Sequence, residues 1–207
     1  MEDEQRRSAG WGTTAGLGKP SPYTVMVSAC LLLSAVAGWS GLVLVVAGQV
    51  VPGWLVGSAL LLVLLVIVGV RAVRRRVAGG EAAKRRSVPA CLVLALLGGA
   101  AGLGSALGAV GDVLGGAEYR VLEPHGPGGC RAVTRETSFL MAGGGEVYAV
   151  GGSGIGRRES SWTADDGLRP IAEGLYRLRW GVGGGSLVVS GRVTDPVRPA
   201  LHGVACD

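Results

Sequence analysis

Long apolar stretches dominate the first half of the chain. No Asp, Glu, Lys or Arg occurs in the 51 residues from Pro20 to Val70, or in the 25 residues from Ser87 to Gly111. A helix of about 20 apolar residues crosses the ~30 Å hydrocarbon core of a bilayer. The first stretch therefore has room for two spans and the second for one. We predict transmembrane helices at residues 23–47, 50–70 and 88–114.

The second half of the chain has shorter apolar runs separated by glycines. "TSFLMAGGGEVYAV" (residues 137–150) and "LYRLRWGVGGGSLVV" (residues 175–189) each contain two β-prone runs on either side of a glycine triplet, at 143–145 and 183–185. Two such runs joined by glycines are typical of a β-hairpin. We predict a small antiparallel all-β domain over residues 116–207, a sandwich or barrel of about six to eight strands. The fold class is therefore three transmembrane helices followed by a β domain.

One glycine-rich segment has a superficial likeness to a nucleotide-binding loop. "EVYAVGGSGIGRRESSW" (residues 146–162) contains Gly152 and Gly154, but Arg157 occupies the third position of a G-x-G-x-x-G pattern. The residues that follow lack the apolar period of a helix, which that motif requires. The segment is interpreted as a strand and its turn, and we expect no cofactor.

Basic residues concentrate between the second and third predicted spans. The net charge is +5, whereas residues 116–207 contain ten Arg and ten acidic residues and so balance. Lys and Arg in short loops favour the cytoplasmic side of a membrane. The basic loop 71–87 is therefore predicted to be cytoplasmic, as is a disordered tail at 1–22, and the β domain extracytoplasmic at the plasma membrane. The basic residues of the loop are Arg71, Arg74, Arg75, Arg76, Lys84, Arg85 and Arg86.

The charge pattern also disfavours several classes of function. The basic loop lacks the interleaved aromatic residues of a nucleic-acid surface, so no nucleic-acid partner is expected. The predicted spans contain no ionisable group before Asp112. Ion and proton pathways usually need such groups within the membrane, which argues against a transporter or channel acting alone. No G-x-S-x-G nucleophile elbow occurs, and we expect no enzyme activity.

Two of the four cysteines bracket the β domain. Cys130 lies near its start and Cys206 is the penultimate residue of the chain. Outside the cytoplasm such a pair is expected to form a disulfide. A metal site is the alternative, because His125 and His202 each precede one of these cysteines by a few residues.

Small residues recur at four-residue spacing in the third predicted span. Gly98 and Gly102, and then Gly104 and Gly108, allow close approach of helix backbones. They are predicted to serve packing of the three helices within one chain, with a homo-oligomer as the alternative.

The composition carries a resemblance as well. Arg outnumbers Lys by 18 to 2 and Asn is absent, as in products of GC-rich genomes. In composition and architecture the chain resembles small multi-pass membrane proteins of high-GC actinobacteria, and this resemblance implies no activity.

The leading functional hypothesis is a binding module with a protein or cell-envelope partner besides the lipid bilayer. Arg and Trp are enriched at interaction hot spots. The candidate surface residues are Arg157, Arg158, Trp162 and Trp180. The alternatives are a metal-binding or hydrolytic extracytoplasmic domain and an accessory subunit of a membrane complex.

Overall fold

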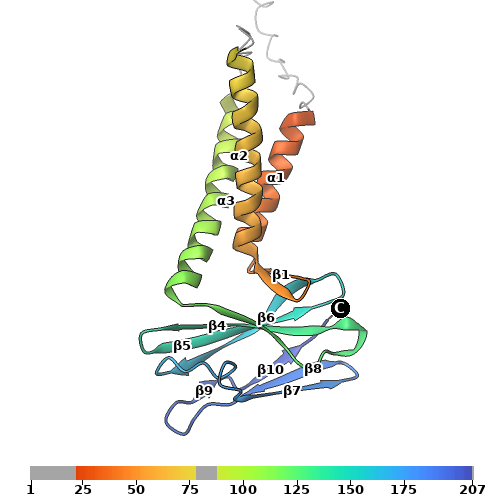
Figure 1. The fold of residues 1–207 in the computed structure, drawn as a ribbon, viewed down its shortest axis with the longest axis vertical. Coiled ribbons are helices and arrows are strands. Elements are labelled where there is room, and N and C mark those ends of the chain that lie inside the picture. Colours follow the sequence, from red (N-terminus) through yellow and green to blue (C-terminus); the bar gives the residue numbers. More distant parts are fainter. Residues whose placement is uncertain (1–21, 78–87, 207) are drawn as a thin grey trace, which may run out of the picture.

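The computed structural model describes residues 22–77 and 88–206, which form a bundle of three helices standing on a β domain (Figure 1). The helices are α1 (Pro22–Trp39), α2 (Gly53–Val77) and α3 (Val88–Leu114). All three are long and apolar enough to cross a membrane, over Pro22–Trp39, Gly53–Arg74 and Leu92–Leu114. Most of their side chains face outward, as expected for helices surrounded by lipid. The chain is a membrane protein. The predicted tail and most of the basic loop lie outside the described residues.

The first helix is shorter than predicted, because residues 43–52 form a β-hairpin. α1 ends at Trp39, and Gly41 follows with φ +60°, a conformation common just after a helix. The valine-rich strands β1 (Val43–Val46) and β2 (Gln49–Pro52) then pair across Ala47 and Gly48. Both turn residues have positive φ, which suits the twist of a two-residue hairpin. The prediction of a span over 23–47 was wrong in its last residues, since apolar strands and apolar helices share the same composition.

The hairpin belongs to the β domain. It pairs with β6 (Ile155–Asp165) through Val43 opposite Gly156. The sheet has seven strands in the order β2-β1-β6-β5-β4-β3, with β9 (Val197–Arg198) attached to β6. The other members are β3 (Glu118–Leu122), β4 (Arg131–Phe139) and β5 (Ala142–Val150). This sheet curls into a nearly closed barrel, with β2 approaching β3. We call it the large sheet.

A smaller sheet covers the large sheet on the side away from the helices (Figure 1). It has three strands in the order β10-β8-β7, namely β7 (Tyr176–Gly181), β8 (Gly184–Val189) and β10 (Leu201–Val204). A short 3₁₀ turn at Pro127–Gly129 precedes β4. The fold confirms the predicted class of three helices followed by an antiparallel all-β domain.

Two apolar clusters pack on opposite faces of the large sheet. One fills the space between the two sheets and includes Val147, Trp162 and Leu187. The other lies inside the curl of the large sheet and includes Val43, Val133 and Tyr148. Alternate residues of a strand point to opposite faces, so Val147 and Tyr148 enter different clusters. The second cluster faces the ends of the helices.

Both predicted glycine hairpins exist, but the first turns earlier than expected. β4 and β5 join through Leu140 and Met141, and the glycines 143–145 lie within β5. A Cβ on Gly145 would collide with the indole ring of Trp162, and one on Gly143 would meet the carbonyl oxygen of Leu168. These glycines therefore make room for neighbouring groups. In the second triplet Gly183 lies in the β7–β8 turn, as predicted, but Gly184 and Gly185 begin β8, where an added Cβ would meet the carbonyl oxygen of Val204 and the indole of Trp180. The segment 146–162 is a strand and its turn, also as predicted.

Candidate functional site

Charged and aromatic side chains meet where the helices join the large sheet. Arg135 on β4 donates from Nε to Oδ1 of Asp112 on α3 at 2.8 Å, and its terminal nitrogen lies 2.7 Å from the same oxygen. Its other terminal nitrogen lies 3.2 Å from Oε2 of Glu146 on β5. The side chains of Arg135 and Asp112 are only 19% and 10% exposed, so little water screens this ion pair.

Four further groups complete this arrangement, which we call the junction network. Trp54 on α2 and Tyr119 on β3 donate to Oδ2 of Asp112, at 2.6 and 2.9 Å. Tyr148 donates to Oε2 of Glu146 at 2.6 Å. Arg158 on β6 lies 2.8 Å from Oε1 of Glu146. Two carboxylates and two guanidinium groups thus neutralise one another, and six elements contribute to the network. They are α2, α3, β3, β4, β5 and β6.

The network shifts the pKa of its members. Burial opposes ionisation of Glu146, but hydrogen bonds from Tyr148 and Arg158 and the charges of Arg135 and Arg158 hold the pKa of this carboxyl below its usual value. Burial is the main cause that raises the pKa of Tyr119, and the Asp112 carboxylate adds to it. Burial raises the pKa of Tyr148 likewise, with Glu146 as the second cause. Both phenols therefore remain hydrogen-bond donors at neutral pH.

A cavity of about 150 Å³ lies beside the junction network. Its polar wall contains Trp54, Asp112, Tyr119 and Glu146, and its apolar wall comes from the ends of the helices and from β1. Every charged group in the wall already has a partner of opposite charge. The arrangement therefore serves to hold the β domain in a fixed position on the helices.

A second buried carboxylate braces a loop of the β domain. Glu136 is 1% exposed and accepts hydrogen bonds from the backbone N–H groups of Ile171 and Ala172, each at 2.8 Å. Burial raises the pKa of Glu136, and these two bonds oppose that rise. Nearby, Arg169 donates to the carbonyl oxygen of Gly116 at 2.7 Å, just beyond the end of α3. These contacts attach the 168–174 loop to α3 and β4.

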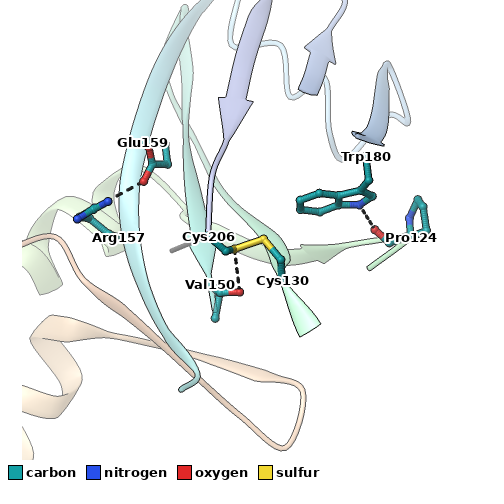
Figure 2. Close-up of a disulfide and its surroundings, with 7 residues drawn as sticks. All are labelled: Pro124, Cys130, Val150, Arg157, Glu159, Trp180 and Cys206. Carbon is teal, nitrogen blue, oxygen red and sulfur yellow. Dashed lines mark hydrogen bonds and ion pairs between the residues drawn. A yellow bond between two sulfur atoms is a disulfide. The ribbon is translucent and has the colours of Figure 1, made fainter. Parts of the chain in front are cut away.

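The predicted disulfide is present (Figure 2). Cys130, at the start of β4, is bonded to Cys206, which follows β10, so the bond joins the two sheets across 76 residues of sequence. The cysteines of the metal alternative are therefore bonded to each other. Its histidines also lie apart, with His125 beside Glu123 and His202 beside Ser160. The described residues contain no group of three or more His, Cys, Asp or Glu that could hold a metal ion.

Ser160 and His202 are the nearest approach to the hydrolytic alternative. His202 Nδ1 lies 2.9 Å from Ser160 Oγ, and burial lowers the pKa of this imidazole. His202 is only 1% exposed and stacks at an angle against Trp162 between the two sheets. No carboxylate forms a hydrogen bond or ion pair with either residue among those described. His202 packs within the core, and Ser160 is half-buried.

The predicted interaction residues have different surroundings. Trp162 is 2% exposed, so its placement on an interaction surface was wrong. Trp180 is half-buried, donates to the carbonyl oxygen of Pro124 at 2.7 Å and covers Gly126 (Figure 2). Arg157 is exposed and lies 3.6 Å from Glu159, while Arg158 belongs to the junction network. Trp180 lies on β7, whereas Trp162 on β6 packs between the two sheets and Arg158 on β6 contacts Glu146. Residue type alone had grouped the four.

The predicted packing glycines divide into two pairs. A Cβ on Gly104 would collide with the indole of Trp39, and one on Gly108 would meet Trp54. Gly98 and Gly102 have no heavy atom of the described residues within 4 Å of an added Cβ. Only the second pair therefore serves packing within the described bundle. The glycines accommodate tryptophan rings, which spacing alone did not indicate.

The basic loop is only partly described. Arg71 and Arg74 belong to α2, and the guanidinium of Arg71 lies 4.3 Å from the centre of the Tyr23 ring. Arg75 and Arg76 also lie within α2, at the end of the bundle opposite the β domain, whereas Lys84, Arg85 and Arg86 lie outside the described residues.

The junction network was missed by sequence reasoning, although Asp112 signalled it. This residue is the first carboxylate after a 25-residue uncharged stretch, and its partner Arg135 follows 23 positions later in an alternating strand. No protein-family model, curated protein or solved structure matches this chain.

Proposed function

We propose that this chain is a membrane-anchored binding module that holds its β domain outside the cell and binds its partner through the outer face of the small sheet. This face is directed away from the helices (Figure 1). One side of the large sheet faces the helices, and its other side is covered by the small sheet. The outer face of the small sheet is therefore the sheet surface that remains open.

The composition of this face supports the proposal. Arg177 on β7, Val188 on β8 and Leu201 on β10 are directly opposite one another in register and are all exposed. The next outward row is Arg179, Ser186 and Gly203. Two apolar side chains thus lie beside two arginines, with small residues next to them. Arginine beside apolar contact area is typical of binding surfaces.

The single observation that carries the proposal is that the two arginines on this face are unpaired. Within residues 22–77 and 88–206, neither Arg177 nor Arg179 forms a hydrogen bond or ion pair through its side chain. By contrast, the exposed Arg120 is paired with Glu118 and the exposed Arg192 with Glu173. Two unpaired guanidinium groups on one flat face favour a partner that presents carboxylate or phosphate groups.

A binding role also agrees better with the buried polar groups than catalysis does. His202, the base that the Ser160–His202 pair would need, is buried between the sheets, where a substrate would have to displace packed side chains.

Site-specific crosslinking in intact cells tests this proposal. A photoreactive amino acid at Val188 should capture a defined partner, and R177E/R179E should abolish that crosslink because it reverses the charge facing the partner. R120E/R157E is the matched control, since it makes the same change in charge at two exposed arginines of the large sheet, outside the junction network, and should leave the crosslink intact. The proposal fails if position 188 captures no partner or if R177E/R179E leaves the captured partner unchanged.

A further inference from the structure

The turn between β4 and β5 presents three large apolar side chains in succession. Phe139, Leu140 and Met141 are 53%, 84% and 74% exposed. Leu140 adopts φ +54°, a conformation uncommon for a residue other than glycine, so its side chain is held at the extreme tip of the hairpin. We call these three residues the apolar tip.

Other exposed apolar residues at turns of the domain are single. Val182, at the β7–β8 turn, lies between two glycines, and Val193 lies between Arg192 and Thr194. Isolated residues of this kind are common on soluble surfaces, whereas a contiguous apolar group indicates a contact. The exposure of three contiguous apolar residues at the tip therefore indicates a contact, whereas the exposure of the single residue Val182 does not.

The apolar tip lies at the level of the last turn of α3. The backbone N–H of Ser138, next to the tip, donates to the carbonyl oxygen of Gly115 at 2.8 Å. Phe139 and Leu114 line a single groove of about 360 Å³, together with Gly111, Thr137 and the glycines at the start of β5. Gly111 and Leu114 both belong to the stretch of α3 that can span the membrane. Figure 1 shows the β4–β5 hairpin extending beneath the end of α3.

The apolar surface is continuous from the helix to the tip. Val110, Val113 and Leu114 on α3 are 53%, 77% and 61% exposed, as residues facing lipid are. Beyond the tip, Asp165 is paired with Ala142 and is exposed, so the polar surface resumes at once. A short apolar projection bounded by polar groups is suited to the boundary between headgroups and acyl chains.

We propose that the apolar tip inserts into the interfacial region of the same bilayer that α3 crosses, with a lipid acyl chain occupying the groove between Leu114 and Phe139. The continuity of the tip with the membrane-spanning surface of α3 identifies lipid as its occupant. The tip is a second point of attachment beside the junction network. It fixes the tilt of the β domain against the membrane.

Fluorescence quenching of the full-length protein in phosphatidylglycerol vesicles tests the proposal. A C30A/C91A background removes the two cysteines of the sequence outside the disulfide, and the Cys130–Cys206 bond remains oxidised. L140C, labelled with an environment-sensitive fluorophore, should lose most of its emission to a nitroxide carried on the lipid chain near the headgroup. The same label should be protected from iodide in the buffer.

V182C is the matched control, because it places the same label on an exposed apolar residue at a hairpin tip remote from α3. Its emission should respond to iodide and not to the lipid nitroxide. Equal access of iodide to both labels would show that the tip lies in water and would overturn the proposal. Protection of the L140C label from both quenchers would also overturn it, since protein would then cover the tip. A cooperative thermal unfolding transition, followed by tryptophan fluorescence, verifies that each variant is folded.

Discussion

Arg135 is the residue on which the junction network depends most. It contacts a carboxylate from the last turn of α3 and another from β5, and it lies between the apolar cluster of the large sheet and the helices. Removing a partner from a buried ion pair leaves an uncompensated charge, which destabilises a fold far more than loss of an exposed pair does.

The substitution R135M is therefore expected to lower the free energy of unfolding by about 3 kcal/mol. R120M is its control, because Arg120 is 48% exposed in its pair with Glu118 and its loss should cost less than about 1 kcal/mol. Denaturant unfolding of both purified variants in detergent, followed by tryptophan fluorescence, measures the difference. Equal losses in the two variants would show that the network adds nothing beyond a surface ion pair.

Glu146 gives the junction network a defined dependence on pH. The pKa of this carboxyl is lower in the folded protein than its usual value of 4.5, so the ionised form favours folding. Its contribution is present above the usual pKa and is lost as the pH falls through the folded pKa.

We expect E146Q to lower the free energy of unfolding by about 1–3 kcal/mol at neutral pH, where charge-assisted hydrogen bonds are lost. The difference from the unmodified protein should shrink as the pH falls from 4.5 through the lower pKa of the folded state, because Glu146 is protonated in both states once the pH lies below both values. Denaturant unfolding curves of both proteins, recorded from neutral pH to below pH 4.5, measure this difference in the free energy of unfolding. E173Q, at the exposed pair with Arg192, should show little effect at any pH, and a constant deficit for E146Q would contradict the argument.

At the scale of elements, the sequence predicted the type of secondary structure better than the residues at which each element begins and ends. The two uncharged stretches predicted three helices correctly, because a membrane tolerates few alternatives. The limit of the first helix was missed, since Val43–Val46 is as apolar as the helix before it. This strand is distinguished from a helix by its pairing with β6, more than a hundred residues away in the sequence. The composition of residues 43–46 does not indicate that pairing.

The glycines also show that local sequence does not predict a residue's tertiary neighbours. Glycine triplets predicted turns, and one of them instead clears space for Trp162 within a strand. The candidate surface was predicted least well, because the orientation of Arg157, Arg158 and Trp162 depends on the register of β6 and on the irregularity opposite Val147 and Tyr148. Residue type alone identifies neither.

The two glycine pairs of α3 give a direct test of helix packing. G108L should lower the thermal stability of the bundle, by about 1–3 kcal/mol in free energy, since its side chain would collide with Trp54. G102L makes the same change at a position with open space around it and should be tolerated. Thermal unfolding of both variants in detergent compares them. A larger loss in G102L would indicate a partner on that face of α3.

At the scale of the whole molecule, one end of the helix bundle carries the entire β domain. The hairpin between α1 and α2 and the segment after α3 enter the same sheet, so both lie on one side of the membrane. The arginines at the end of α2 lie at the opposite end of the bundle. The excess of basic residues there favours the cytoplasm, and we therefore propose that the β domain lies outside.

A membrane-impermeant maleimide tests this orientation in intact cells. V182C in the β domain should react readily, whereas V77C at the far end of α2 should react only after the cells are permeabilised. Both residues are highly exposed, so accessibility within the protein does not distinguish them. The reverse pattern of labelling would place the β domain in the cytoplasm.

The pairing of β1 with β6 makes the membrane anchor part of the domain's own architecture. A fragment cut free after α3 would keep the disulfide and the small sheet, but β6 would lose its neighbour at Ile155 and Gly156. An uncovered strand edge of this kind invites pairing with other chains. Shedding by a protease should therefore yield a species prone to self-association, and a recombinant version would require β1 and β2 to be grafted back onto it.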